Sequence, residues 1–282
     1  MLKFTKMEGL GNDYVYLDGT VNGEPEDVSS LARFVSRPHF GVGSDGLILI
    51  LASDKADFRM KMLNKDGTEA EMCGNGIRCV GKFVYDKGLT SKTDITIETL
   101  GGIKHLLLQV KGNQVEKVTV DMGEPIFDCD KIPVRLEKED NLDFPQIERF
   151  VIDRTFQMHC VSVGNPHAVT IVDNLATLDV EKYGSQLEVD PYFPNKSNIE
   201  FVELVDDTHI KMRVWERGSG ETMACGTGAT ACIAVCARLG CIQKKATVEL
   251  LGGLLEFEWD EKTNHIWMTG PARTVFEGEL EQ

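Results

Sequence analysis

Two short Cys-Gly segments carry residues whose types and spacing suit acid–base chemistry. They are Cys73-Gly74-Asn75-Gly76 and Cys225-Gly226-Thr227-Gly228. A cysteine directly before a helix meets N–H groups that lack a partner within the helix and carry partial positive charge. These groups favour a thiolate and can lower the pKa of a thiol below its free value of about 8.5. Because glycine lets the backbone approach a carboxylate closely, each segment is typical of a reactive thiol beside an anion site.

The two segments belong to an internal repeat. Aligning Cys73 with Cys225 also places Glu69 on Glu221, and it superimposes the alternating apolar and basic residues of 58–62 on those of 210–214. Each copy predicts a half-buried strand, a polar Gly-rich connection, the Cys-Gly turn and then a helix. The second helix is apolar all round, which is typical of a helix buried on every side.

Two such thiols on related halves indicate proton transfer between the two faces of one carbon. One thiolate would remove an α-proton beside a carboxylate, and the opposite thiol would deliver a proton to the other face. Backbone amides at two helix N-termini would stabilise the charge that develops on the carboxylate. The base needs a pKa tuned toward the working pH.

Other uses of the cysteines remain open. Zinc is disfavoured, because the cysteines do not have CxxC spacing and no histidine stands nearby at ligand spacing. A switchable disulfide between Cys73 and Cys225 is a second possibility, and a phosphate cradle without a recognised nucleotide motif is a third. The remaining cysteines are expected to pack in the interior: Cys79, Cys129, Cys160, Cys232, Cys236 and Cys241.

Composition sets limits on the class of protein. The chain has 282 residues, and its 30 Lys and Arg against 45 Asp and Glu give a formal net charge of −15. This excess disfavours binding to nucleic acid or to an anionic membrane surface. We expect no secretory signal and no spanning helix, and the dilute cysteines favour a reducing cytoplasm.

The strand and helix patterns predict an α/β (α+β) fold. We expect two related halves, each a sheet wrapped around a buried helix. The predicted domains are 1–122, together with a C-terminal strand at 272–282, and 123–271. Strands are predicted at 46–51, 95–98, 115–121, 168–172, 201–205, 247–251 and 254–259, and helices follow Gly76 and Gly228.

These residues together resemble the diaminopimelate epimerase family, the pyridoxal-phosphate-independent amino-acid epimerases of lysine and peptidoglycan precursor synthesis. The resemblance runs nearly end to end, and its most specific strings are Met72-Cys73-Gly74-Asn75-Gly76-Ile77-Arg78-Cys79 and Glu216-Arg217-Gly218 followed by Ala224-Cys225-Gly226-Thr227-Gly228. It also includes Lys6–Asp13, Asn64–Gly67, Gly164–His167, Asn198, Glu221-Thr222 and Gly270–Ala272.

The resemblance implies two pseudo-symmetric halves, each a mostly antiparallel sheet wrapped around a buried helix, with the active site in the cleft between them. It also implies conversion of LL-diaminopimelate to meso-diaminopimelate by a homodimeric enzyme without metal or organic cofactor. It implies that Cys73 and Cys225 form the acid/base pair and that His167 and Glu216 tune the thiol pKa values. The residues that it implies for substrate binding are Asn12, Asn64, Gly74, Asn75, Asn165, Asn198, Glu216, Arg217, Gly226 and Thr227. Arg217 could take the distal carboxylate of this double zwitterion in a bidentate contact.

Structural roles for the polar residues stay open at this point. The asparagines are also natural turn residues, Glu216 and Arg217 could form a structural pair, and His167 could be a hydrogen-bonded core histidine.

Two positions depart from the family pattern. Gly46 stands where some members contact substrate through Gln, and Glu8 stands where others have His. Phe276 lies where the family has an aromatic residue at its subunit interface. The alternative functions are a two-cysteine racemase of proline or hydroxyproline, a thiol redox sensor and a binding protein.

Overall fold

The chain folds into two compact units. A computed structural model describes residues 1–70, 72–136 and 144–281. One unit consists of Met1–Asp121 together with Thr269–Gln282, and the other consists of Met122–Met268. β17 (Ile266–Pro271) spans the second boundary and returns the chain to the first unit.

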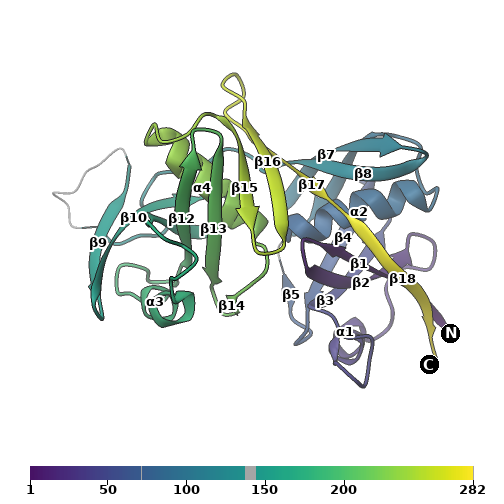
Figure 1. Ribbon diagram of the computed structural model, residues 1–282. Helices are drawn as coiled ribbons and strands as arrows, with labels where there is room; N and C mark the ends of the chain where they lie inside the picture. The colour runs from purple at the N-terminus through teal and green to yellow at the C-terminus, as the bar shows by residue number, and fades with distance from the viewer. Residues whose placement is uncertain (71, 137–143, 282) are drawn as a thin grey trace. The chain divides into compact units, whose positions relative to one another are not determined.

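The first unit is a mostly antiparallel sheet that the C-terminal strand completes. β18 runs antiparallel to β1, with Leu280 opposite Leu2, so the two ends of the chain lie side by side (Figure 1). The parallel pairs are β2 with β3 and β4 with β6. Its strands are β1 (Leu2–Gly9), β2 (Asn12–Gly19), β3 (Gly46–Leu51), β4 (Phe58–Asn64), β5 (Glu69–Ala70), β6 (Asp94–Thr99), β7 (Gly102–Lys111), β8 (Gln114–Asp121) and β18 (Arg273–Leu280).

Two helices pack on this sheet in different ways. α1 (Val28–Ser36) begins at the N-cap Asp27, whose carboxylate accepts a hydrogen bond from the amide of Ser30. α2 (Gly74–Asp86) is buried from Gly74 to Val84 and packs against β1, β2, β7 and β8. The sheet therefore surrounds α2 and leaves little of it in contact with water.

The second unit has the same kind of sheet around α4 (Gly226–Arg238), with the shorter α3 (Val180–Leu187) on its outside. The parallel pairs are β11 with β12 and β13 with β15. Its strands are β9 (Gln146–Val151), β10 (Arg154–Ser162), β11 (Pro166–Ile171), β12 (Asn198–Asp206), β13 (His209–Glu216), β14 (Gly220–Glu221), β15 (Lys245–Leu250) and β16 (Gly253–Trp259).

The order of elements confirms the internal repeat. The succession β4, β5, α2, β6, β7 in the first unit corresponds to β13, β14, α4, β15, β16 in the second. In both units the strand after the buried helix runs parallel to the long strand before it. The expected α/β class, with two similar and mostly antiparallel halves, is therefore confirmed.

The sequence placed the buried helices correctly but began them too late. Both helices start at the residue directly after the cysteine, so the two glycines of each Cys-Gly segment lie in the first helical turn. α1 and α3 were not predicted, because each is short and much of its surface is polar. Across the described ranges, none of the helices has the length and apolar character that crossing a membrane requires.

Candidate active site

Cys73 is the N-cap of α2 and lies in a network of side chains from β2. Its Sγ accepts a hydrogen bond from the amide of Gly76 at 3.3 Å and donates to Oδ1 of Asn12 at 3.1 Å. The thiol is only partly buried. It therefore has the expected position at a helix N-terminus, with a polar partner on the neighbouring strand.

A carboxylate that sequence reasoning missed orients Asn12. Asp45 accepts from Nδ2 of Asn12 at 2.7 Å and from the amide of Asp13 at 3.1 Å. The Asn12 amide group is thereby turned so that its oxygen faces Cys73. Glu8 contributes from the same turn, because its carboxylate accepts from the amide of Gly11 at 2.9 Å. Glu8, which stands where other family members have His, thus stabilises the turn between β1 and β2 that precedes Asn12.

Asn75 and Gly74 lie in the first turn of α2 and are held by a buried arginine. Arg78 donates to the carbonyl of Gly74 at 3.1 Å and to Oδ1 of Asn75 at 3.0 Å. Nδ2 of Asn75 lies 3.4 Å from Oδ1 of Asn12. Four predicted site residues of the first unit are therefore together: Asn12, Cys73, Gly74 and Asn75.

Asn64 lies apart from this network. It ends β4 and donates from Nδ2 to Oγ1 of Thr68 at 3.1 Å. Across the sheet it pairs with Gly46, which in turn pairs with Tyr14. A Cβ at Gly46 would lie 2.1 Å from the carbonyl oxygen of Leu63 and 2.9 Å from Cε1 of Tyr14. The backbone at position 46 therefore has no room for a glutamine side chain.

Cys225 is the N-cap of α4 and is more deeply buried than Cys73. Its Sγ accepts from the amide of Gly228 at 3.4 Å and lies 3.5 Å from Oγ1 of Thr227. Burial raises the pKa of Cys225 well above its usual value, and the negative charges of Glu216 and Glu200 raise it further. The amide of Gly228 at the helix N-terminus does act to lower this pKa, as expected, but burial and the two carboxyl groups outweigh it.

Three predicted residues beside Cys225 form a chain of contacts that ends at a residue not predicted, Glu200. Nε2 of His167 lies 2.9 Å from Oδ1 of Asn165, and Nδ2 of Asn165 lies 3.4 Å from Oγ1 of Thr227. On its other side, Nδ1 of His167 lies 2.6 Å from Oε1 of Glu200. The signal for Glu200 was present in the sequence as a lone acidic residue inside the apolar run that follows Asn198.

Glu216 lies against Cys225. Its Oε1 accepts from Oγ1 of Thr222 at 2.5 Å, and its carboxylate also hydrogen bonds with the Cys225 thiol. Burial raises the pKa of Glu216, and the nearby Glu200 adds to this increase. The hydrogen bond from Cys225 acts to lower the pKa of Glu216, whereas the negative charge of Glu216 raises the pKa of Cys225.

Asn198 and Arg217 lie at the edge of this second group. Asn198 donates from Nδ2 to the carbonyl of Pro166 at 2.8 Å and accepts the amide of Arg217 at 2.9 Å. The guanidinium of Arg217 is exposed and donates to the carbonyl of Asn195 at 3.2 Å. A charged group in this position is available to an anionic part of a ligand. Glu216 and Arg217 are not bonded to each other by any contact found among the described residues.

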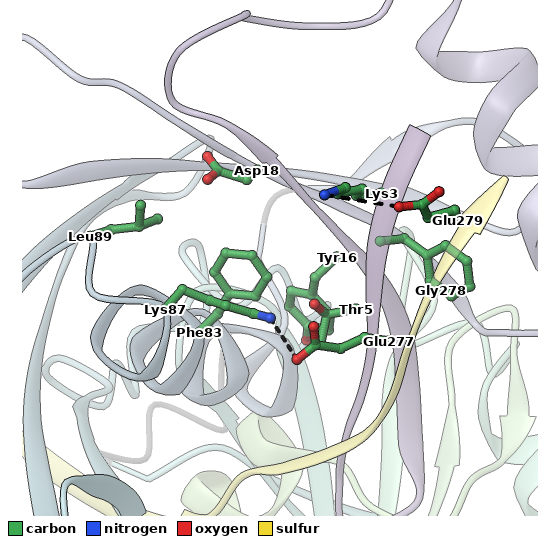
Figure 2. A pocket seen from close by; sticks show the side chains of 11 residues that line it. Lys3, Thr5, Tyr16, Asp18, Phe83, Lys87, Leu89, Glu277, Gly278 and Glu279 are labelled. Atoms are coloured by element: carbon green, nitrogen blue, oxygen red, sulfur yellow. Dashed lines mark ion pairs between the residues drawn. The ribbon is translucent and has the colours of Figure 1, made fainter. Parts of the chain in front are cut away.

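A surface hollow of the first unit lies away from these residues. It measures about 490 Å³ and is lined by residues of β1, β2, α2 and β18. Figure 2 shows its apolar wall around Phe83, with the Lys87–Glu277 ion pair at 2.6 Å and the more exposed Lys3–Glu279 pair at 3.9 Å. None of the predicted site residues lines it, so this hollow is not the candidate active site. In the described parts of the chain, no cluster of His, Cys, Asp and Glu could hold a metal ion.

The chain is similar to known proteins over nearly its whole length. The diaminopimelate epimerase family model matches residues 4–127 and 159–275. A diaminopimelate epimerase of Methanococcus maripaludis is 56% identical over 280 residues, covering 99% of this chain and 100% of its own length. The corresponding protein of Acetivibrio thermocellus is 53% identical and covers 99% of each chain.

Solved structures of lower identity share the fold. A probable proline racemase from Agrobacterium radiobacter has a TM-score of 0.71 at 14% identity, covering 100% of this chain and 93% of its own. A Bacillus anthracis phenazine biosynthesis protein of the PhzF family has a TM-score of 0.68 at 20% identity, covering 100% and 99%. At these identities the similarity concerns the fold alone.

Proposed function

Because the chain belongs to the diaminopimelate epimerase family, we propose that it converts LL-diaminopimelate to meso-diaminopimelate by proton transfer between two cysteine thiols. It is an isomerase of the amino-acid epimerase type. The observation that carries the mechanism is the matching position of Cys73 and Cys225, each the N-cap of the buried helix of its unit. Two thiols in matching positions suit a reaction whose two steps mirror each other.

The proposed reaction moves one proton on each face of the α-carbon. A thiolate takes the α-proton, and the opposite thiol donates its own proton to the other face. After one turnover the first sulfur is therefore a thiol and the second is a thiolate. This requires both thiols to face the same α-carbon. The backbone amides of Gly74, Asn75, Gly226 and Thr227 would stabilise the carboxylate as negative charge develops on it.

The remaining polar residues would bind the rest of the substrate. Diaminopimelate has two ammonium and two carboxylate groups. The exposed guanidinium of Arg217 suits the distal carboxylate, and the oxygens of Glu216 and of the asparagines suit an ammonium group. A cyclic imino acid such as proline has no distal charges, so these side chains favour diaminopimelate over a proline racemase substrate.

The proposal also covers the pathway that the enzyme serves, its compartment and its oligomeric state. The enzyme would serve lysine and peptidoglycan precursor synthesis in the cytoplasm, without pyridoxal phosphate or metal. It would act as a homodimer, and the side chains of Val275 and Phe276, 55% and 46% exposed on β18, are apolar surface that a second copy could cover. Light scattering at several protein concentrations would test the dimer.

Proton NMR of LL-diaminopimelate in D₂O tests the proposed reaction. Reduced protein, dialysed against a chelator and free of pyridoxal phosphate, should exchange the α-proton for deuterium while LL converts to meso. Absence of exchange under reducing conditions would refute the substrate assignment. Parallel samples with proline and hydroxyproline would show whether the chain is a racemase of those compounds instead.

Substitution of the thiols tests the mechanism. Cys73→Ala and Cys225→Ala should each lower kcat by at least about 10³-fold, because each removes one of the two proton carriers. Cys236→Ala is the matched control, since Cys236 lies in the buried helix that Cys225 caps, about three turns from the N-cap. Near-normal turnover in either of the first two variants would contradict a two-thiol mechanism.

A further inference from the structure

His167 and Glu200 form an ionisable pair that has no contact with water. Both side chains are 0% exposed, and Nδ1 of His167 lies 2.6 Å from Oε1 of Glu200. They come from the neighbouring parallel strands β11 and β12. Because burying charged groups is costly even when they are paired, such a pair in the interior requires an explanation.

The second oxygen of Glu200 makes the arrangement costlier. Oε2 is buried and has no hydrogen-bond partner in the described parts of the chain. An unsatisfied buried oxygen costs about 1–3 kcal/mol, and a charged one costs more. A residue that served only to anchor His167 would not need a second buried oxygen without a hydrogen-bond partner. The unsatisfied oxygen therefore points to a role for Glu200 beyond that of anchoring His167.

The carboxyl group of Glu200 lies against the turn that holds the Cys225 thiol. A Cβ on Gly228 would be 2.8 Å from Oε1 of Glu200 and 3.3 Å from Sγ of Cys225, so both atoms border the same small volume. Gly228 is the residue whose amide donates to Sγ. With no side chain at position 228, nothing there separates the carboxyl group from the sulfur.

Several ionisable groups surround Glu200. His167 reaches it from β11, Glu216 lies on β13, Cys160 on β10, and Cys225 and Cys232 on α4. The negative charge of Glu200 raises the pKa of each of the four acidic groups among these neighbours. His167 is the basic member of this group, and it fixes the position of Oε1.

We propose that Glu200 is a positioning residue whose buried carboxylate, anchored by His167, keeps the Cys225 thiol protonated in the resting enzyme. This inference rests on the proposed function, in which one thiol must be a proton donor while the other is a base. The proton remains on Sγ of Cys225 because a thiolate there would lie beside a second negative charge that no water screens. Glu200 thereby assigns the donor role to Cys225 before substrate binds.

The test measures the ionisation of Cys225 without substrate. Iodoacetamide reacts with the thiolate form, and mass spectrometry of the Cys225 peptide gives its alkylation rate at each pH. Glu200→Gln keeps the shape and can still accept from Nδ1 of His167, but it removes the charge. The midpoint of the pH profile should fall by about one pH unit or more, which makes alkylation roughly tenfold faster at pH values below both midpoints.

Glu203→Gln is the matched control. Glu203 lies on the same strand, and its carboxylate accepts from the amide of Leu175 at 2.7 Å. Its alkylation midpoint should equal that of the unmodified protein. An unchanged or higher midpoint in Glu200→Gln, with a native circular dichroism spectrum, would overturn the proposal. If Glu200→Gln does not fold, Glu200→Asp is the decisive variant, because its shorter side chain moves the charge away from Sγ. Its alkylation midpoint should fall by a smaller amount. An unchanged or higher midpoint in Glu200→Asp would also overturn the proposal.

The epimerase assay adds a separate readout. In Glu200→Gln the alkaline limb of the kcat/KM profile should move to lower pH, since the proton donor is lost earlier. If the protein epimerises diaminopimelate but the alkylation midpoint does not move, the role of Glu200 fails and the proposed function stands. If the midpoint moves but no epimerisation occurs, the proposed function fails and the control of Cys225 by Glu200 stands.

Discussion

Gly46 lies on β3 where the neighbouring backbone excludes a side chain. The carbonyl oxygen of Leu63 would be 2.1 Å from its Cβ, so even alanine requires the two strands to separate. We expect Gly46→Ala to lower the free energy of unfolding by about 1–3 kcal/mol, the usual cost of overpacking a core. Urea unfolding would measure this. Asp54→Ala, in the exposed connection after β3, is the control and should change the free energy by less than about 0.5 kcal/mol; an equally small effect of Gly46→Ala would contradict the crowding.

Residue types alone led to Cys73, Cys225 and their glycines as candidates, because the Cys-Gly pattern occurs twice within one repeat. They did not identify Asp45, Glu200 or the position of Arg78. Asp45 is 33 residues from Asn12 in sequence and contacts it through the pairing of β2 with β3. Such contacts depend on strand register, which a single sequence does not determine.

At the scale of elements, each of the two thiols proposed to be catalytic is also a helix cap. Sγ of Cys73 accepts the amide of Gly76 in the place where serine usually serves. We expect Cys73→Ser to be at least as stable as the unmodified protein, and Cys73→Ala to be about 1 kcal/mol less stable, because alanine cannot cap. Both should lack epimerase activity. Thermal unfolding followed by circular dichroism would measure the difference, and a serine variant less stable than the alanine variant would contradict the capping role.

Periodicity predicted elements well where one pattern ran without interruption. The strand predicted at 46–51 coincides with β3, and Gly88 and Gly240 follow the ends of α2 and α4 with positive φ, as expected after a helix. The first turns of α2 and α4 were missed because Gly, Asn and Thr have low helix propensity. Burial of both helices stabilises these turns, and intrinsic helix propensity does not include this contribution from packing.

At the scale of the whole molecule, the repeat predicted two similar halves because a buried helix needs a sheet around it in each copy. The pairing of β18 with β1 could not be read from periodicity, since it joins opposite ends of the chain.

The interior of both units also contains cysteines, and this gives the molecule a specific response to pH. Burial raises the pKa of Cys79 and of Cys236 to about 12, and it raises that of Cys160 further.

The sign of this response follows from proton binding. Below about pH 8.5 a cysteine holds its proton in both the folded and the unfolded chain, so the full stability is present. Between about pH 8.5 and 12 the unfolded chain releases the proton of Cys79 while the folded chain retains it, and stability therefore falls as pH rises. Each such thiol should lower the free energy of unfolding by about 1.4 kcal/mol per pH unit in this range.

Urea unfolding at pH 8 and pH 10, with a reductant present, would measure this loss. We expect the protein to lose several kcal/mol between these values, since several thiols contribute together. Cys79→Val should make the loss smaller by about 1–2 kcal/mol, because it removes one titrating group. Val84→Ala is the matched control: it truncates a buried side chain of the same helix, so it should lower stability at both pH values and leave the difference between them unchanged. A loss that is identical in Cys79→Val and in Val84→Ala would show that alkaline destabilisation does not come from the buried thiol.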